Sequence, residues 1–86
     1  MQNQEFSYEV MKQYGVFSEN RTEKGVTYAK EVNLISYRNG QPVIDIRNWI
    51  IENDGRRKMG KGITMNRDEM TALCRVLDEV YRSAAE

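Results

Sequence analysis

The chain has 86 residues, 40% of them apolar and 30% charged, with 13 basic residues balancing 13 acidic ones. One small domain of this length buries too little surface to be very stable alone, so a partner subunit is expected. The absence of histidine excludes Ser–His and Cys–His catalysis and most zinc sites, and the single Cys74 cannot form an internal disulfide. We therefore expect a cytoplasmic protein without catalytic activity, cofactor or metal.

The charges are distributed unevenly along the chain. Residues 38–67 carry seven basic and three acidic side chains, a net charge of +4, whereas residues 68–86 carry two basic and five acidic ones. A local patch of charge decides what a protein attracts more than the sum does. The middle of the chain is therefore the expected site for an anionic partner.

Four antiparallel strands are predicted, within about residues 5–18, 26–38, 42–52 and 57–65. Asn39-Gly40 and Asp54-Gly55 are strong hairpin signals, because both central turn positions need positive φ. The apolar period then changes to a helical one over about residues 67–84, with Asn66 and Glu69 spaced as a capping box. The predicted fold class is α+β: a four-stranded antiparallel meander followed by one C-terminal helix, in a single domain spanning residues 1–86.

The predicted helix has a wide apolar stripe. A stripe of this width suits a helix that meets both the sheet and another subunit. The residues expected in this core or dimer contact are Met70, Leu73, Val76, Leu77 and Val80.

Two-residue turns at both hairpins would fix the register of the central strands. One face would then be apolar and covered by the helix, with Asn48 and Lys61 interrupting it at its rim. The pairs on this face would be Ile35 with Ile44, Ile46 with Ile63, Ile44 with Met65, and Ile50 with Met59.

The same register would place a mixed aromatic and basic surface on the other face. Lys30 would lie opposite Trp49, and Gly60 and Gly62 would leave room beside Trp49 and Arg47. Rings that stack on bases and cations that follow phosphates are typical of single-strand binding, whereas duplex readers more often present a basic helix. The remaining members of this face would be Tyr28 and Lys58.

The stretch "GRRKMGKGIT" at residues 55–64 nearly matches a phosphate-binding loop. Gly62 stands where a magnesium-binding hydroxyl is needed, and "KGITM" predicts a strand where the loop should lead into a helix. The near-match is therefore interpreted as a coincidence.

Several pieces in fixed order resemble the single-stranded-DNA-binding domain of the transcriptional coactivator positive cofactor four, and still more its bacterial relatives of the YdbC type. They are "IDIR" at 44–47, Trp49, "KMGKGIT" at 58–64 and "MNRDE" at 65–69. The resemblance implies a dimer with curved sheets lining channels for single-stranded DNA. It also implies that Arg47, Lys58 and Lys61 face the DNA and that aromatic rings stack with bases.

This chain departs from the eukaryotic pattern in two ways. The eukaryotic tryptophan stands one residue later, at the position of Ile50, so Trp49 follows the bacterial pattern. The glycine-lysine segment is also one residue shorter, and a bulge at Gly60 or Gly62 would be needed to turn Lys61 toward DNA.

The predicted function is that of a dimeric single-stranded DNA-binding protein of low sequence specificity, in transcription regulation as a coactivator, or in replication or repair. Single-stranded RNA or an acidic protein are alternative partners, and no membrane partner is expected. For Arg47 the alternative is a salt bridge with Asp45, and for Trp49 it is packing in a dimer core. The candidate nucleic-acid-binding residues are Arg47, Trp49, Lys58, Lys61, Lys30, Tyr28, Tyr37, Arg38, Arg56 and Arg57.

Overall fold

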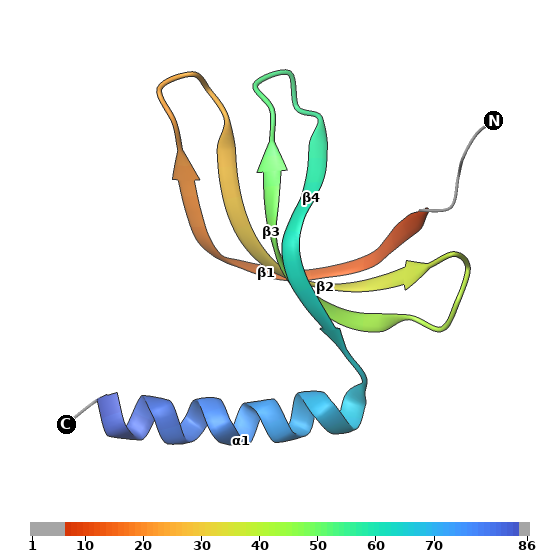
Figure 1. The fold of residues 1–86 in the computed structure, drawn as a ribbon, viewed down its shortest axis with the longest axis vertical. Coiled ribbons are helices and arrows are strands. Elements are labelled where there is room, and N and C mark those ends of the chain that lie inside the picture. The colour runs from red at the N-terminus through yellow and green to blue at the C-terminus, as the bar shows by residue number, and fades with distance from the viewer. Residues whose placement is uncertain (1–6, 85–86) are drawn as a thin grey trace.

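The computed structural model describes residues 7–84, which form one antiparallel sheet and one helix (Figure 1). The sheet has the order β1-β2-β3-β4, so each strand pairs with the next one in the chain. This confirms the predicted α+β meander. The elements are β1 (Tyr8–Arg21), β2 (Thr27–Tyr37), β3 (Val43–Ile51), β4 (Arg57–Met65) and α1 (Arg67–Ala84).

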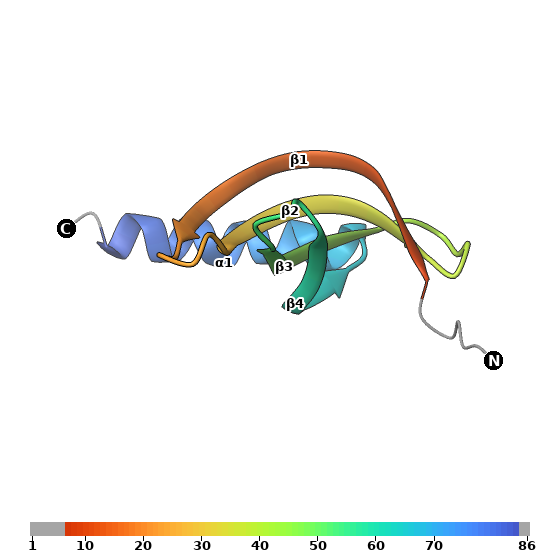
Figure 2. The same ribbon diagram turned by 90° about the horizontal axis from the view of Figure 1, so that it is seen from above.

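The strand β1 is the longest in the sheet and it is irregular. It ends at Arg21 where about residue 18 was predicted, and residues 5 and 6 of the predicted strand lie outside the described residues. Its pairing with β2 shifts at three places, between Val10 and Lys12, Gln13 and Gly15, and Val16 and Ser18. Bulges bend a strand and increase its twist. The long arch of β1 in Figure 2 is consistent with these three shifts.

The first central hairpin turns one residue earlier than predicted. Its positive φ angles belong to Arg38 (54°) and Asn39 (60°), and the N–H of Gly40 donates to the carbonyl of Tyr37 at 2.8 Å. The whole pairing is displaced by one residue, so that Ala29, and not Lys30, lies opposite Trp49. A slip of one residue moves every side chain of a strand to the other face. The predicted faces of β2 are therefore exchanged.

The second central hairpin combines a longer loop with a bulge. Glu52 donates its N–H to the carbonyl of Arg56 at 2.8 Å, and Gly55 has a φ of 92°, which is the three-residue hairpin loop with a left-handed third residue. Further along, Gly60 and Lys61 together lie opposite Asn48. The expected bulge is therefore present in β4, but it leaves Lys61 opposite Asn48 and does not turn it to the face of Arg47 and Trp49.

The loop and the bulge each shift the pairing by one residue, and their effects cancel beyond the bulge. The predicted partners on that side are therefore correct, although those near the loop are wrong. The confirmed pairs are Ile46 with Ile63, Ile44 with Met65, and Arg47 with Gly62; the corrected ones are Ile50 with Lys58 and Trp49 with Met59.

The pairing defines two faces of the sheet. The inner face carries the side chains that become buried within the curved sheet, and the outer face carries those that face the helix or solvent. Around the two central strands the inner face consists of Ala29, Glu31, Asn33, Ile35, Asp45, Arg47 and Trp49. The outer face consists of Tyr28, Lys30, Val32, Ile44, Ile46, Asn48, Ile50, Ile63 and Met65.

The helix α1 begins with the predicted capping box. The N–H of Glu69 donates to Oδ1 of Asn66 at 2.8 Å, and the N–H of Asn66 donates to Oε1 of Glu69 at 2.9 Å. Beyond this start, α1 contacts only β3 and β4, and none of its residues is buried. The molecule is accordingly open and flat, with extents of 51 × 37 × 18 Å, and α1 lies along its lower edge in Figure 1.

We expect Gly62→Ala to lower the free energy of unfolding by about 1–3 kcal/mol, the usual effect of overpacking. A Cβ at Gly62 would lie 2.0 Å from the Cβ of Arg47 and 2.6 Å from the carbonyl oxygen of Ile46. Urea denaturation measures the loss. Gly15→Ala is the matched control, because nothing lies within 4 Å of its added Cβ; equal stability of the two variants would contradict the close packing at Gly62.

Candidate nucleic-acid interface

The indole of Trp49 packs inside the inner face. Its exposed fraction is 1%, the guanidinium carbon of Arg57 lies 4.7 Å from its ring centroid, and the Tyr8 ring centroid lies 5.9 Å away. The prediction of an open indole beside Lys30 is therefore wrong, because the one-residue slip puts small Ala29 opposite Trp49 and Lys30 on the outer face. The helix does not cover this ring, since it packs on the other face.

Arg47 forms an internal ion pair on the same face. Its Nη2 lies 2.6 Å from Oδ2 of Asp45, which is fully buried, and its Nε donates to Oδ1 at 2.7 Å. A third group, Nη1, donates to the carbonyl of Gly60 at 3.0 Å and so ties β3 to the bulge. The hydrogen bonds to Asp45 raise the pKa of Arg47 further above its ordinary value. The structure thus contains the salt bridge that was the alternative reading, and a phosphate contact of Arg47 stays a prediction.

A second ion pair neutralises the other charges of the inner face. Arg57 lies 2.7 Å from Oε1 of Glu31, whose side chain is 2% exposed and also accepts hydrogen bonds from Gln13 and Asn33. Breaking a buried pair by removing one partner leaves an uncompensated charge, which is strongly unfavourable. Arg47 and Arg57 are therefore both paired with buried carboxylates. The guanidinium of Arg57 also lies over the Trp49 ring.

Tyr37 completes the polar cluster at the end of β2. Its hydroxyl donates to Oδ2 of Asp45 at 2.5 Å and accepts from Nη2 of Arg47 at 3.1 Å. Burial raises the pKa of Tyr37 to about 12, and the adjacent Asp45 carboxylate adds to this effect by disfavouring a phenolate. Tyr37 thus serves as a hydrogen-bond donor at neutral pH.

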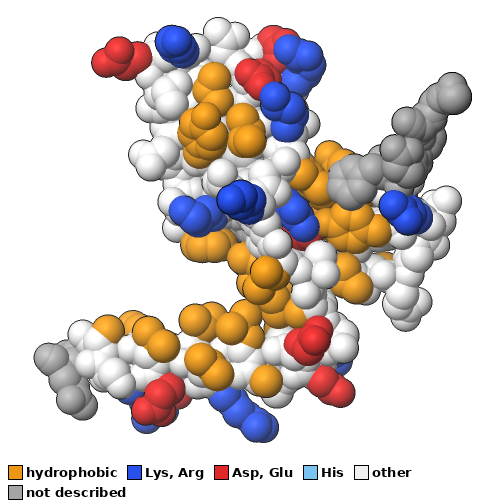
Figure 3. Space-filling view, viewed as in Figure 1, with side chains coloured by type: hydrophobic (Ala, Val, Ile, Leu, Met, Phe, Trp, Pro, Cys, Tyr) orange, Lys and Arg blue, Asp and Glu red, His pale blue; other side chains and the backbone are white. Residues whose placement is uncertain are grey.

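The cations left for an external anion gather on the outer face. Lys30 of β2 and Lys58 and Lys61 of β4 surround the side chains of Asn48 and Ile50 of β3, next to Tyr28, which is 41% exposed. Figure 3 shows hydrophobic and basic side chains mixed on this upper part of the sheet. We call this surface the outer basic patch, and it comprises Tyr28, Lys30, Asn48, Ile50, Lys58 and Lys61.

The acidic neighbours of this patch are few. Within residues 7–84 neither Lys30 nor Lys61 forms an ion pair, and Lys58 lies 3.2 Å from Glu52 with its own side chain 64% exposed. An exposed pair of this kind contributes little and is easily exchanged for another anion. The patch therefore presents usable positive charge.

Gly60 and Gly62 bring β4 close to β3. A Cβ at Gly60 would lie 2.7 Å from the carbonyl oxygen of Asn48, and one at Gly62 would collide with Arg47. The predicted position of Gly60 opposite Trp49 is therefore wrong, whereas Gly62 does lie opposite Arg47. Their role is to allow the bulge.

The remaining candidates lie apart from the patch. Arg38 occupies the β2–β3 turn with its left-handed backbone, and exposed Arg56 pairs with Asp54 at 2.7 Å in the β3–β4 loop. The near-match to a phosphate-binding loop runs through this loop into β4, and α1 begins only at Arg67. No strand-to-helix phosphate cradle exists there, as predicted. The described part of the chain holds no cluster of three or more metal-ligating side chains, and none of its helices could span a membrane.

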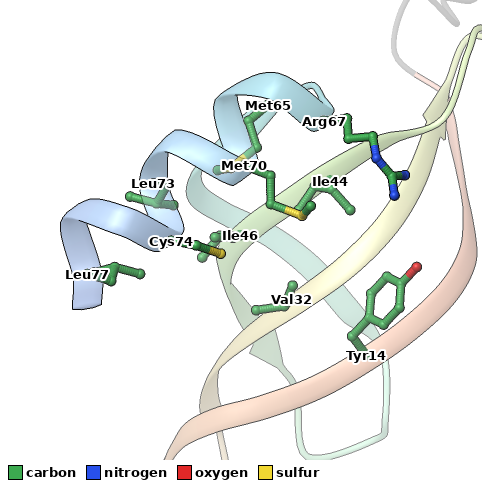
Figure 4. A pocket seen from close by; sticks show the side chains of 10 residues that line it. All are labelled: Tyr14, Val32, Ile44, Ile46, Met65, Arg67, Met70, Leu73, Cys74 and Leu77. Carbon is green, nitrogen blue, oxygen red and sulfur yellow. The ribbon is translucent and has the colours of Figure 1, made fainter. Parts of the chain in front are cut away.

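An apolar groove of about 470 Å³ lies on the other half of the outer face, between the sheet and α1 (Figure 4). Met70, Leu73, Cys74 and Leu77 of the helix point toward it, as Figure 4 shows. The predicted contact residues of α1 thus differ in how far the sheet covers them. Met70 and Leu73 are partly covered, whereas Val76, Leu77 and Val80 are 58%, 53% and 56% exposed. The sheet side of the groove is formed by Tyr14, Val32, Ile44, Ile46 and Met65.

Comparison with known proteins identifies a family for this chain. Residues 21–76 match the family described as Transcriptional Coactivator p15 (PC4), a stretch that includes the patch, the bulge and the start of α1. The chain belongs to this family. The family is one of single-stranded-DNA-binding, non-enzymatic modules with a role in transcription. An uncharacterized protein of Treponema pallidum (strain Nichols) is 37% identical over 79 residues, which cover 91% of this chain and 84% of that protein.

Sequence reasoning did not place Asn48 and Ile50 in the outer basic patch. Both were assigned to the apolar face, and Asn48 was recognised only as an interruption at its rim. The outer face is indeed apolar near α1, but it becomes basic beyond Asn48. The usable signal was the eukaryotic tryptophan position, which falls on Ile50 and hence on the outer face.

We expect the stability of the protein to fall as the pH rises from about 10 to about 12. The pKa of Tyr37 is raised from 10.0 to about 12, so the folded state retains a proton that the unfolded chain releases. The contribution of Tyr37 to the free energy of unfolding is complete below pH 10 and is lost progressively between pH 10 and about 12. Urea denaturation across this range should show a shallower decline for Tyr37→Phe than for the wild type, whereas the exposed control Tyr28→Phe should follow the wild type. Equal slopes for all three proteins would contradict the assignment.

Proposed function

We propose that the protein binds single-stranded DNA across the outer basic patch, with little dependence on sequence, as a dimer without catalytic activity. The processes that it serves are those that expose unpaired DNA: transcription, replication and repair. The observation that carries the proposal is the gathering of Lys30, Lys58 and Lys61 around exposed Tyr28 on one face. Membership of a family of single-strand binders supports the same ligand.

The patch has the two components that single-strand binding needs. Cations hold the phosphate backbone, and an aromatic face stacks a base, which contributes about 1–3 kcal/mol per base. Lys30 and Lys61 lie on either side of Asn48, and Tyr28 and Lys58 lie on either side of Ile50. A strand that crosses β2, β3 and β4 would meet a cation at both edges of the patch and Tyr28 at its border.

The family resemblance points to the same face. The eukaryotic tryptophan stands at the position of Ile50, which lies in the patch between Tyr28 and Lys58. In this chain the tryptophan stands one residue earlier in the sequence, at position 49. Its side chain therefore lies on the inner face, where it is packed. We infer that Tyr28 supplies the stacking ring here and Ile50 an apolar contact.

The unpartnered helix supports the dimer. Most of the stability of a protein helix comes from packing its apolar face, yet no residue of α1 is buried. Its apolar stripe and the groove beside it form one exposed apolar surface, and the same surface on a second copy would complement it about a two-fold axis. A dimer formed there leaves the outer basic patch, at the other end of the strands, open to DNA.

The salt dependence of binding tests the interface. We expect the affinity for oligo-dT to fall with salt, and Lys30→Gln, Lys58→Gln and Lys61→Gln each to reduce the log–log slope by up to about 0.7 per lost phosphate contact. Fluorescence anisotropy at several salt concentrations measures this. Arg75→Gln on the polar side of α1 is the charge-matched control and should leave the slope unchanged. Unchanged slopes in all three lysine variants would refute binding at this patch.

The helix surface has its own test. We expect Leu77→Glu to convert the dimer into a monomer, because it places a charge in the centre of the apolar stripe, where Leu77 is 53% exposed in the single chain. Sedimentation equilibrium measures the mass. Arg75→Glu adds an acidic side chain to the opposite side of α1 and should remain dimeric. A wild-type chain that sediments as a monomer would overturn the proposed dimer.

A further inference from the structure

Asn48 occupies an unexplained position in the outer basic patch. It stands in the middle of β3, a central strand, although asparagine is disfavoured in strands. Its side chain makes no hydrogen bond to any other residue between 7 and 84, and it is only half-buried. Natural proteins depart from local structural preferences, without a compensating contact, chiefly at functional sites.

The surroundings of Asn48 keep its amide accessible. Lys30 lies directly opposite it on β2, and on β4 the bulge places Gly60 and Lys61 opposite it. A Cβ at Gly60 would lie 2.7 Å from the carbonyl oxygen of Asn48, which is too close, so position 60 carries no side chain. Because position 60 is glycine, the amide remains uncovered on that side and is flanked by two cations.

We propose that Asn48 hydrogen-bonds the edge of one unpaired base in the bound strand and gives the protein a preference for adenine at that position. This inference rests on the proposed single-stranded DNA binding. The side-chain amide offers one acceptor and two donors, which match a base edge that presents an amino group beside a ring nitrogen. Adenine presents this pair on two edges, as N6 with N7 and as N6 with N1, and cytosine presents it on one, as N4 with N3; thymine has no amino group. Adenine therefore offers the amide the most matching edges in a single strand.

The preference is local and leaves the rest of the interface tolerant of sequence. Lys30 and Lys61 contact the phosphates on either side of the selected base, and Tyr28 stacks a neighbouring one. Phosphate contacts position a strand without reading its sequence, whereas an amide–base contact discriminates. Asn48 is therefore a specificity-determining residue within a largely non-specific interface.

The test compares oligo-dT with a strand of equal length that carries one central dA. We expect wild-type protein to bind the dA-containing strand on the order of tenfold more tightly, within the range of an amide–base pair. Asn48→Ala should bind both strands equally and keep the wild-type salt slope. Gln41→Ala removes an exposed amide in the β2–β3 connection, at the other end of the strands from Tyr28, and should keep the preference. Urea denaturation of Asn48→Ala verifies that it is folded.

The outcomes separate the inference from the function on which it rests. Equal wild-type affinity for the two strands, or a preference that persists in Asn48→Ala, would overturn the role of Asn48 and leave single-strand binding intact. Absence of salt-dependent binding to either strand would overturn both.

Discussion

The bulge at Gly60–Lys61 is the constraint on which the two faces of this sheet depend. On its loop side it leaves Arg57 and Met59 on the inner face above Trp49, and on its helix side it leaves Ile63 and Met65 on the outer face. A strictly alternating β4 could satisfy only one of these demands, because its side chains change face at every residue. The glycines at 60 and 62 are required because any Cβ there would collide with β3.

The inner face contains a small cluster of buried polar side chains. This cluster determines which cationic side chains are available to bind an external anion. Its two arginines lie against Asp45 and Glu31, both nearly inaccessible to solvent. Withdrawing either arginine toward a phosphate would leave a buried carboxylate without its partner, a cost of several kcal/mol. The lysines of the outer face carry no such cost. Their positive charge is therefore the more effective attraction for a polynucleotide.

The sequence was sufficient for the fold but not for the side chains that share each face. Strand order, the capping box at Asn66 and the apolar row of Ile44, Ile46 and Ile63 follow from period and turn residues, which are local. The register of β2 against β3 does not follow in the same way. The turn predicted at Asn39-Gly40 is centred one residue earlier, at Arg38-Asn39. That single step moved Tyr28 and Lys30 away from Trp49. The candidate residues had thus been assigned to one surface, whereas the structure distributes them over two.

In the proposed complex the outer face links assembly to binding, because both surfaces include residues of β2, β3 and β4. Near α1 this face is apolar, and beyond Asn48 it is basic. Asn48, Lys30 and Lys61 lie at the border between these two halves. The side-chain amide of Asn48 is therefore not buried in the apolar half. Because β3 and β4 run continuously from the apolar half to the basic half, a partner packed on the groove would hold the strands in register beneath the patch. Dimerisation would therefore preorganise the lysines for a strand that they could not order alone.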